Sequence, residues 1–238
     1  MRAKELESKL GYQFSSPDVL RRAFTHRSWA HEHVGGSEEA RRLEENESLE
    51  FLGDSVLGLV IAEELYRRYP GRGEGILTLM KHRLVSTATL ARLAEELKLG
   101  EHLRMGRGEE KTGGRRKAAI LADTFEAALG AIFIDGGFTA ASEVILRIFE
   151  PEFAAVTPDT AADYKTMLQE RLQARKMSAP AYELVRTEGR PHDRVFFVEA
   201  VWATGRADGS GTSLKAAEMM AASKALKMLE AADQNGAT

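Results

Sequence analysis

The sequence predicts two domains of different class: an all-α domain over residues 1–150 and a small α+β domain over residues 163–231. Three observations support this prediction. Helical patterns follow one another through the first two-thirds of the chain, where no strand pattern is seen. The composition changes over 151–162, where prolines, acids and small residues are typical of a linker. Beyond this linker the order becomes helix, strand, strand, short third strand and helix.

The helices of the first domain are recognised by their ends. Ser16-Pro17-Asp18 places a capping residue before a proline at the first helical position, which predicts a helix through Phe24. A long pattern from Glu44 to Tyr69 ends where Pro70 disfavours helix. Further helices are predicted over 76–86, 87–97, 117–134 and 139–149. The Gly-rich, polar stretch 104–116 is predicted to be a loop.

The second domain combines two helices with three strands. A helix is predicted over 163–175 and a second over 213–230, with Ser213 as its cap. Residues rich in Val, Phe, Tyr and Trp predict strands over 181–187 and 195–204, with a short strand near 205–210. The α-β-β-β-α order occupies about 75 residues, which is enough for an independent module.

Composition excludes several classes of protein. The 238 residues include no cysteine, which excludes a disulfide scaffold, a Cys-ligated zinc site and a thiol nucleophile. No apolar run is long enough to span a bilayer, and the charged N-terminus is not a secretory signal. We therefore expect a cytoplasmic protein with no membrane partner. The net charge of −3 requires any nucleic acid to be bound through local basic patches.

Three carboxylates lie in an unusual place on the long helix. Glu47, Glu50 and Asp54, at i, i+3 and i+7, share one helical face, although like charges there repel. Their neighbours are largely apolar, which makes the acids more costly still. Gly53, in mid-helix, costs about 1 kcal/mol relative to alanine. Such a glycine indicates close approach by a backbone or a ligand.

A later helix carries a second acidic pair in apolar surroundings. Asp123 and Glu126 are spaced i, i+3. Two helices presenting such pairs can converge on an oxygen-ligand site for Mg²⁺ or Mn²⁺, with Glu74 as an outer contributor. The residues alone leave open the ordinary alternative, in which each pair is a solvated helix face. Three histidines, His26, His31 and His33, lack an acid or cysteine at a spacing that would complete a zinc site.

Asn46–Leu57, NESLEFLGDSVL, resembles the signature of the bacterial ribonuclease III family, the endonucleases of double-stranded RNA. The similarity includes Gly11–Trp29, the PGRGEGILTLMKHRLVS stretch, the region around Asp123 and Glu126, and the C-terminal module. These segments follow in the family's order, and the resemblance covers nearly the whole chain. One departure is the segment Trp29–Glu45, which is longer than in the family's shortest members.

The resemblance implies roles for the acids. Four of them match the ligands of the catalytic magnesium, for which manganese substitutes: Glu50, Asp54, Asp123 and Glu126. Of these, Asp54 and Glu126 match the two on which cleavage depends most. Glu47 matches an acid implicated in substrate placement, and Glu74 matches one that completes the cluster from a neighbouring helix.

The resemblance also implies an activity. Family members are homodimers in which each site cuts one strand, leaving a 5′-phosphate, a 3′-hydroxyl and a two-nucleotide 3′ overhang. Ribosomal and messenger RNA precursors are the expected substrates. A rival reading is a double-stranded RNA-binding protein that does not cut, but it would be marked by the loss of one of the four acids, and all are present. A hydrolase of small phosphates would leave 163–231 without a purpose.

The C-terminal module resembles a double-stranded RNA-binding domain. Thr166, Gln169 and Gln173 share one helical face and match residues that face 2′-hydroxyls in the minor groove. The resemblance adds four further residues, two in a loop that enters the next minor groove and two at phosphate-contacting positions: Arg190, His192, Lys215 and Lys224. Leu214 replaces one residue of the family's usual basic pair. From Thr157 to Thr238 the chain has 11 basic and 11 acidic residues, so we expect weak, salt-sensitive binding by the isolated module.

Overall fold

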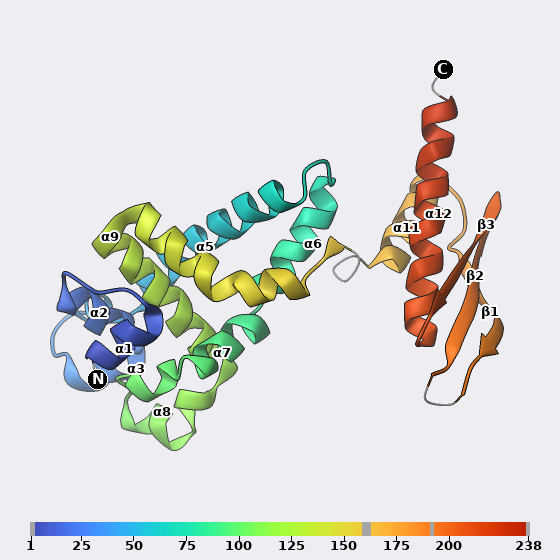
Figure 1. Ribbon diagram of the computed structural model, residues 1–238. Coiled ribbons are helices and arrows are strands. Elements are labelled where there is room, and N and C mark those ends of the chain that lie inside the picture. The colour runs from blue at the N-terminus through green and yellow to red at the C-terminus, as the bar shows by residue number, and fades with distance from the viewer. Residues whose placement is uncertain (1–2, 159–162, 191–192, 237–238) are drawn as a thin grey trace. The chain divides into compact units, whose positions relative to one another are not determined.

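The computed structural model describes residues 3–158, 163–190 and 193–236, and the chain divides into two units at residue 161 (Figure 1). The first unit is helical, as predicted. Its elements are α1 (Ala3–Leu10), α2 (Pro17–Ala23), α3 (Arg27–His33), α4 (Glu38–Arg42), α5 (Glu47–Arg68), α6 (Glu74–Leu84), α7 (Thr87–Glu96), η1 (Leu99–His102), α8 (Arg107–Lys111), η2 (Gly114–Arg116) and α9 (Ala118–Ala155). Strand-like pairing within residues 3–158 is limited to an isolated bridge between Thr25 and Arg104.

Helix α9 is the centre of the first unit. It packs against α2, α5 and α7, and it bends at Gly137, whose φ of 78° is accessible to glycine without strain. Phe125 and Phe149 are fully buried and pack edge to face, with ring centroids 6.1 Å apart. Among the described helices, α9 is the one that is long and apolar enough to cross a membrane by length and composition alone, a test that core helices also pass. Its contacts make it a core helix here.

Helices α5 and α9 touch through their backbones. A Cβ atom built on Gly53 would collide with the carbonyl oxygen of Glu126, and one on Gly130 would collide with the carbonyl oxygen of Leu49. The close approach expected at Gly53 is therefore confirmed, and the approaching group is the backbone of α9. Because the two glycines face each other, the helices that carry the acidic residues lie side by side.

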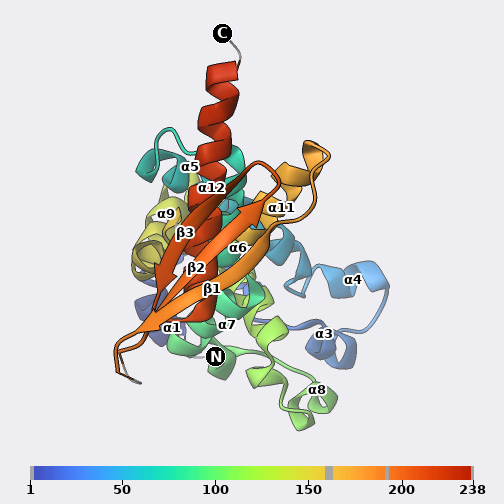
Figure 2. The same ribbon diagram turned by 90° about the vertical axis from the view of Figure 1, so that its right-hand side faces the viewer.

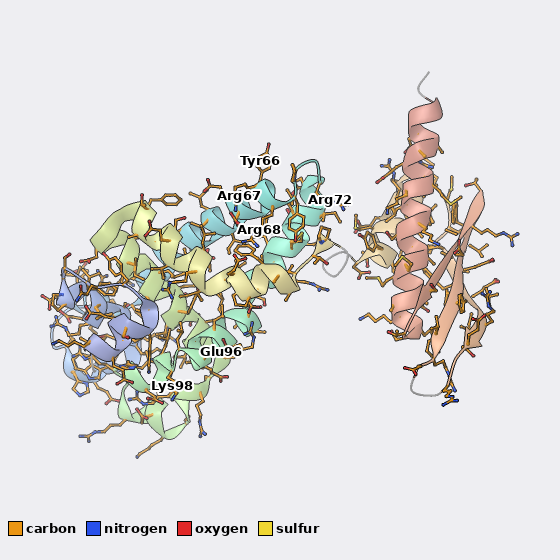
Figure 3. The ribbon with its side chains drawn as sticks, viewed as in Figure 1. Tyr66, Arg67, Arg68, Arg72, Glu96 and Lys98 are labelled. Atoms are coloured by element: carbon orange, nitrogen blue, oxygen red, sulfur yellow. The ribbon has the colours of Figure 1, made fainter. Side chains whose placement is uncertain are left out.

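Helix α9 continues past Pro151 to Ala155, so the first residues of the expected linker are helical. Tertiary contacts oppose the disruption that proline causes. Phe153 is 2% exposed, and the Arg68 guanidinium lies 4.5 Å from its ring centroid. Figure 3 labels Arg68 near the end of α5. Arg68 also pairs with Glu150 at 2.5 Å, which joins the end of α5 to α9.

The predicted loop over 104–116 contains short helices instead. Ion pairs hold this glycine-rich stretch in place: Lys117 with Glu109 at 2.5 Å and Arg115 with Glu110 at 2.7 Å. Arg115 also donates to the carbonyl oxygens of Gly100 and Leu103, each at 2.8 Å. These contacts join residues 5 to 15 positions apart, so they depend on specific pairings that the composition of the stretch does not reveal.

Hydrogen bonds to Asp135 of α9 hold the N-terminal helices in place. Its carboxylate accepts hydrogen bonds from the Tyr12 hydroxyl and from the backbone N–H groups of Ser15 and Ser16, each at 2.8 Å. The carboxylate therefore fixes the turn between α1 and α2. Leu6 and Leu10 of α1 are fully buried in the same core.

The second unit has the predicted α-β-β-β-α order: α11 (Tyr164–Ala174), β1 (Ala181–Glu188), β2 (Val195–Trp202), β3 (Gly205–Gly211) and α12 (Leu214–Gly236). The strands form an antiparallel sheet in the order β1-β2-β3, with an irregularity between Leu184 and Arg186 (Figure 2). Trp202 packs in a core with the buried leucines and alanines of the two helices. The Asp163 side chain caps α11, and that of Ser213 accepts a hydrogen bond from the backbone of Ala216 at 3.1 Å.

The glycine contact predicts opposite effects for two substitutions in α5. Gly53→Ala forces the helices apart and should lower the free energy of unfolding by about 1–3 kcal/mol. Gly58→Ala should raise it by about 0.5–1 kcal/mol, because a Cβ there meets only the flexible end of Lys81, at 3.2 Å. Denaturant unfolding of the two variants measures both effects. Equal stabilities would contradict the backbone contact.

Candidate metal centre in the helical unit

Three carboxylates converge where α5 and α9 touch. Glu50 of α5 and Asp123 and Glu126 of α9 each offer an oxygen atom, and these atoms lie within 4.8 Å of one another. All three side chains are half-buried. Carboxylate oxygens are the ligands that magnesium and manganese prefer, so the donor set fits a hard divalent cation. In the part of the chain that the structure describes, no histidine belongs to such a group.

The electrostatics of this acidic triad also fit a cation. Burial, followed by the charges of Asp123, Glu47 and Asp54, raises the pKa of Glu50 to about 7. Burial likewise raises the pKa of Glu126 to about 7, followed by the charges of Asp54, Glu50 and Asp123. The pKa of Asp123 is raised by burial and by Glu47. The ionised triad is thus destabilising until a positive charge offsets it.

The other predicted acids lie outside the triad. Asp54 is exposed on the next turn of α5, and its charge acts on Glu50 and Glu126. Glu47 is exposed at the start of α5 and lies 3.4 Å from Arg27. Glu74 begins α6 and accepts a hydrogen bond from the Thr78 hydroxyl at 2.9 Å. The structure thus brings three of the four predicted metal ligands together and places Asp54 beside them.

A cavity of about 510 Å³ borders the triad. Its lining includes Glu50 and Asp123 of the triad, together with His26, Asn46 and Lys117. Sequence reasoning did not assign a role to Asn46 or Lys117. The available signal was their position, because each immediately precedes a long helix that carries the acids.

The residues predicted to bind RNA lie on the second unit. Thr166, Gln169 and Gln173 are exposed along α11, as their spacing requires. Arg190 and Lys215 are also exposed, whereas His192 lies outside the described residues. Lys224 is exposed but pairs with Asp208 of β3 at 2.7 Å. A phosphate would have to compete with that carboxylate.

Comparison with known proteins gives matches to both units. A family model described as "Ribonuclease-III-like" matches residues 16–152, and one described as "Double-stranded RNA binding motif" matches residues 164–229. Proteins named Ribonuclease 3 from Geobacter metallireducens and Nitratidesulfovibrio vulgaris are 46% and 44% identical. The alignments cover 94% of this chain and 90% of the first relative, and 95% of this chain and 88% of the second.

A solved structure resembles the helical unit. The nuclease domain of ribonuclease III from Campylobacter jejuni is 36% identical, with a TM-score of 0.56, over 64% of this chain and 96% of that one. A second structure of that domain, with a TM-score of 0.57, covers 64% of this chain and 99% of that one. Its description refers to structural flexibility in a region involved in dimer formation.

The raised pKa values predict how stability depends on pH. Between the ordinary glutamate value of 4.5 and about 7, the folded protein binds more protons than the unfolded chain. In the absence of metal, the free energy of unfolding should therefore fall as the pH rises through this window and stay low above it. Because Mg²⁺ binds the ionised triad, it should raise Tm more at pH 8 than at pH 5.5.

Thermal unfolding with and without Mg²⁺ at the two pH values measures this dependence. Glu126→Gln is the control, because it removes one of the two titrating groups and should flatten the pH dependence. A magnesium-induced shift in Tm that is as large at pH 5.5 as at pH 8 would contradict the assignment.

Proposed function

The chain belongs to the ribonuclease III family, and on that basis we infer that it is a magnesium-dependent, homodimeric endoribonuclease that hydrolyses double-stranded RNA. The observation that carries this inference is the acidic triad, set in a helical unit that matches the nuclease family model and joined to a double-stranded RNA-binding module. Manganese should substitute for magnesium, since both prefer oxygen ligands.

Four acids perform the chemistry in this proposal. All four would hold the metal: Glu50, Asp123 and Glu126 from the triad and Asp54 from its exposed position on the next turn of α5, with cleavage depending most on Asp54 and Glu126. A bound magnesium ion lowers the pKa of water and stabilises the negative charge that develops on the phosphate. The half-buried position of the triad strengthens its attraction for a cation, because screening by water is reduced there. Glu47 and Glu74 are accessory acids. Hydrolysis leaves 5′-phosphate and 3′-hydroxyl ends with a two-nucleotide 3′ overhang.

An apolar face of α5 supports a homodimer. Val56, Leu57 and Val60 are buried within the subunit, but Phe51 and Leu59 are 77% and 57% exposed. Exposed aromatic and aliphatic side chains on one side of a helix are typical of an interface. A two-fold dimer presents two equivalent sites to the two strands of a duplex, so each site cuts one strand.

The second unit supplies affinity for the duplex. Thr166, Gln169 and Gln173 would contact 2′-hydroxyls from α11, and Arg190 and His192 would enter a neighbouring minor groove. Lys215 would contact phosphate, with Lys224 contributing once it leaves Asp208. Because α9 continues to Ala155, we move the expected boundary between nuclease domain and linker from residue 150 to residue 155, and we keep the RNA-binding domain at 163–231. Processing of ribosomal and messenger precursors would occur in the cytoplasm.

The first functional prediction is cleavage that requires both RNA and a metal. The purified protein should cut a long RNA duplex in Mg²⁺ and leave it intact in EDTA, and it should not cut duplex DNA. Glu126→Gln should lower cleavage by at least about 100-fold, because one charge that binds the metal is lost. Duplex binding should survive, since it is spread over both domains. A denaturing gel and a gel-shift assay separate the two effects. Equal cleavage of RNA and DNA would overturn the proposal.

A truncation tests the role of the second unit. A chain ending at Val156 retains the whole acidic triad and should still cleave the RNA duplex at low salt. Its activity should fall steeply as salt rises, because the contacts of the second unit with the RNA backbone are missing. Initial rates at several KCl concentrations measure the difference from the full chain. Equal rates at physiological salt would show that the second unit is not needed for substrate binding.

A further inference from the structure

Asn46 has a side chain that the fold itself does not use. Asparagine is a preferred N-cap residue, and Asn46 immediately precedes α5. Its backbone, however, is already helical, with φ −89° and ψ −12°, and its side chain makes no capping hydrogen bond. Only the backbone is engaged: its N–H donates to Thr25, and its carbonyl accepts from Leu49 and Glu50. The usual structural reason for an asparagine at this position is therefore absent.

The Asn46 residue is nonetheless almost entirely buried. It is 3% exposed and lines the cavity beside the triad. Among the described residues, the hydrogen bonds of Asn46 are those of its backbone. Its amide atoms reach the cavity rather than a sealed interior, because the Tyr182 hydroxyl is the buried side-chain atom that lacks a partner in the described parts of the chain. A ligand in the cavity can therefore supply hydrogen bonds to the amide.

The cavity offers both donors and acceptors to a ligand. Lys117 is held at its edge by Glu109, at 2.5 Å, and by the Thr112 hydroxyl, at 3.0 Å. The Nδ1 atom of His26 accepts from the backbone N–H of Ser28 at 3.2 Å, which leaves Nε2 to carry the ring proton. Donors and acceptors thus meet in one space next to the proposed metal ligands.

The charges around the cavity select the kind of ligand. Two basic side chains, Arg27 and Lys117, line it against four acidic ones: Glu47, Glu50, Glu109 and Asp123. This excess of acids disfavours a second anion at Asn46, beyond the phosphodiester that the proposed metal would hold at the triad. A neutral hydroxyl can donate to one end of an amide and accept from the other. In an RNA duplex the group with this property on every nucleotide is the ribose 2′-hydroxyl.

We propose that Asn46 binds the 2′-hydroxyl of a ribose next to the cleaved phosphodiester, so that the nuclease domain itself selects RNA. The proposal rests on the cleavage of double-stranded RNA inferred above. It makes Asn46 a specificity-determining residue, distinct from the metal ligands and from the 2′-hydroxyl contacts expected of α11. The position of the ribose follows from the cavity, because Glu50 and Asp123 form part of its wall.

The test is a set of short RNA duplexes with one cleavage site. Each duplex carries a single 2′-deoxy substitution at a different nucleotide around the cut, and single-turnover rates in Mg²⁺ are compared with those of the unmodified duplex. For the wild-type protein, one position beside the cut should lose about fivefold in rate, the value of a neutral hydrogen bond. Asn46→Ala should cleave the unmodified duplex more slowly by a similar factor. For Asn46→Ala, the deoxy substitution at that same position should change the rate by less than about twofold.

Matched variants distinguish a contact between Asn46 and the substrate from a role of Asn46 in folding alone. Gln169→Ala removes a predicted 2′-hydroxyl contact of the second unit and should leave the sensitivity beside the cut unchanged. Ser86→Ala removes a cap that exists, since the Ser86 hydroxyl accepts from the Thr89 backbone at 3.3 Å. It should lower Tm more than Asn46→Ala does, without altering the deoxy profile. Asn46→Gln, which displaces the amide by one methylene, should lose the sensitivity as Asn46→Ala does.

The outcomes are distinct. If either Asn46 variant retains the wild-type sensitivity to deoxy substitution, the proposal is wrong. If the Asn46 variants lose the same factor in rate on every duplex, and this loss grows as the salt concentration rises, the cavity binds a phosphate and the proposal is wrong. A wild-type protein that cuts no duplex RNA would overturn the proposed function and this inference with it.

Discussion

The backbone contact between α5 and α9 is the constraint on which the site depends. Because neither Gly53 nor Gly130 has a side chain, the two helices approach more closely than ordinary packed helices do. Glu50 lies three residues before Gly53, and Glu126 lies four before Gly130, so the contact places both carboxylates at the same crossing. Any residue with a Cβ at either glycine would widen the gap that the acids share. The candidate metal site is thus a property of two helices rather than of either one.

The crossing concentrates negative charge where it is destabilising, and the rest of the unit offsets the cost. Helix α9 carries fully buried aromatic side chains at Phe125, between the two acids, and at Phe149, well beyond them. Apolar burial of this kind contributes roughly 1.5–3 kcal/mol for each large side chain. The fold can therefore tolerate three carboxylates whose protonation is favoured in the absence of a cation. The three carboxylates that destabilise the metal-free fold are the same groups that would bind a cation.

Much of this arrangement could be predicted from the sequence, because the acids repeat at helical spacing inside apolar stretches and Gly53 interrupts one of them. The position of Asp54 outside the triad could not be predicted. Spacing along one helix does not fix where another helix crosses it, so it does not show which acids of α5 lie at the crossing. The continuation of α9 past Pro151 depends on Arg68, a residue distant in sequence. The Asn46 side chain makes no capping hydrogen bond, and the backbone at this residue is already helical. Residue type alone does not specify those backbone angles.

The fastening at Asp135 has a consequence for the order in which the chain folds. Its hydrogen bonds to Tyr12, Ser15 and Ser16 join residues 119 to 123 positions apart. During synthesis at about 5–20 residues per second, α1 and α2 leave the ribosome several seconds or more before their anchor exists. Closing so large a loop costs conformational entropy before any contact repays it. The buried leucines of α1 must therefore stay exposed through this interval, and docking of the N-terminus belongs to the late steps of folding.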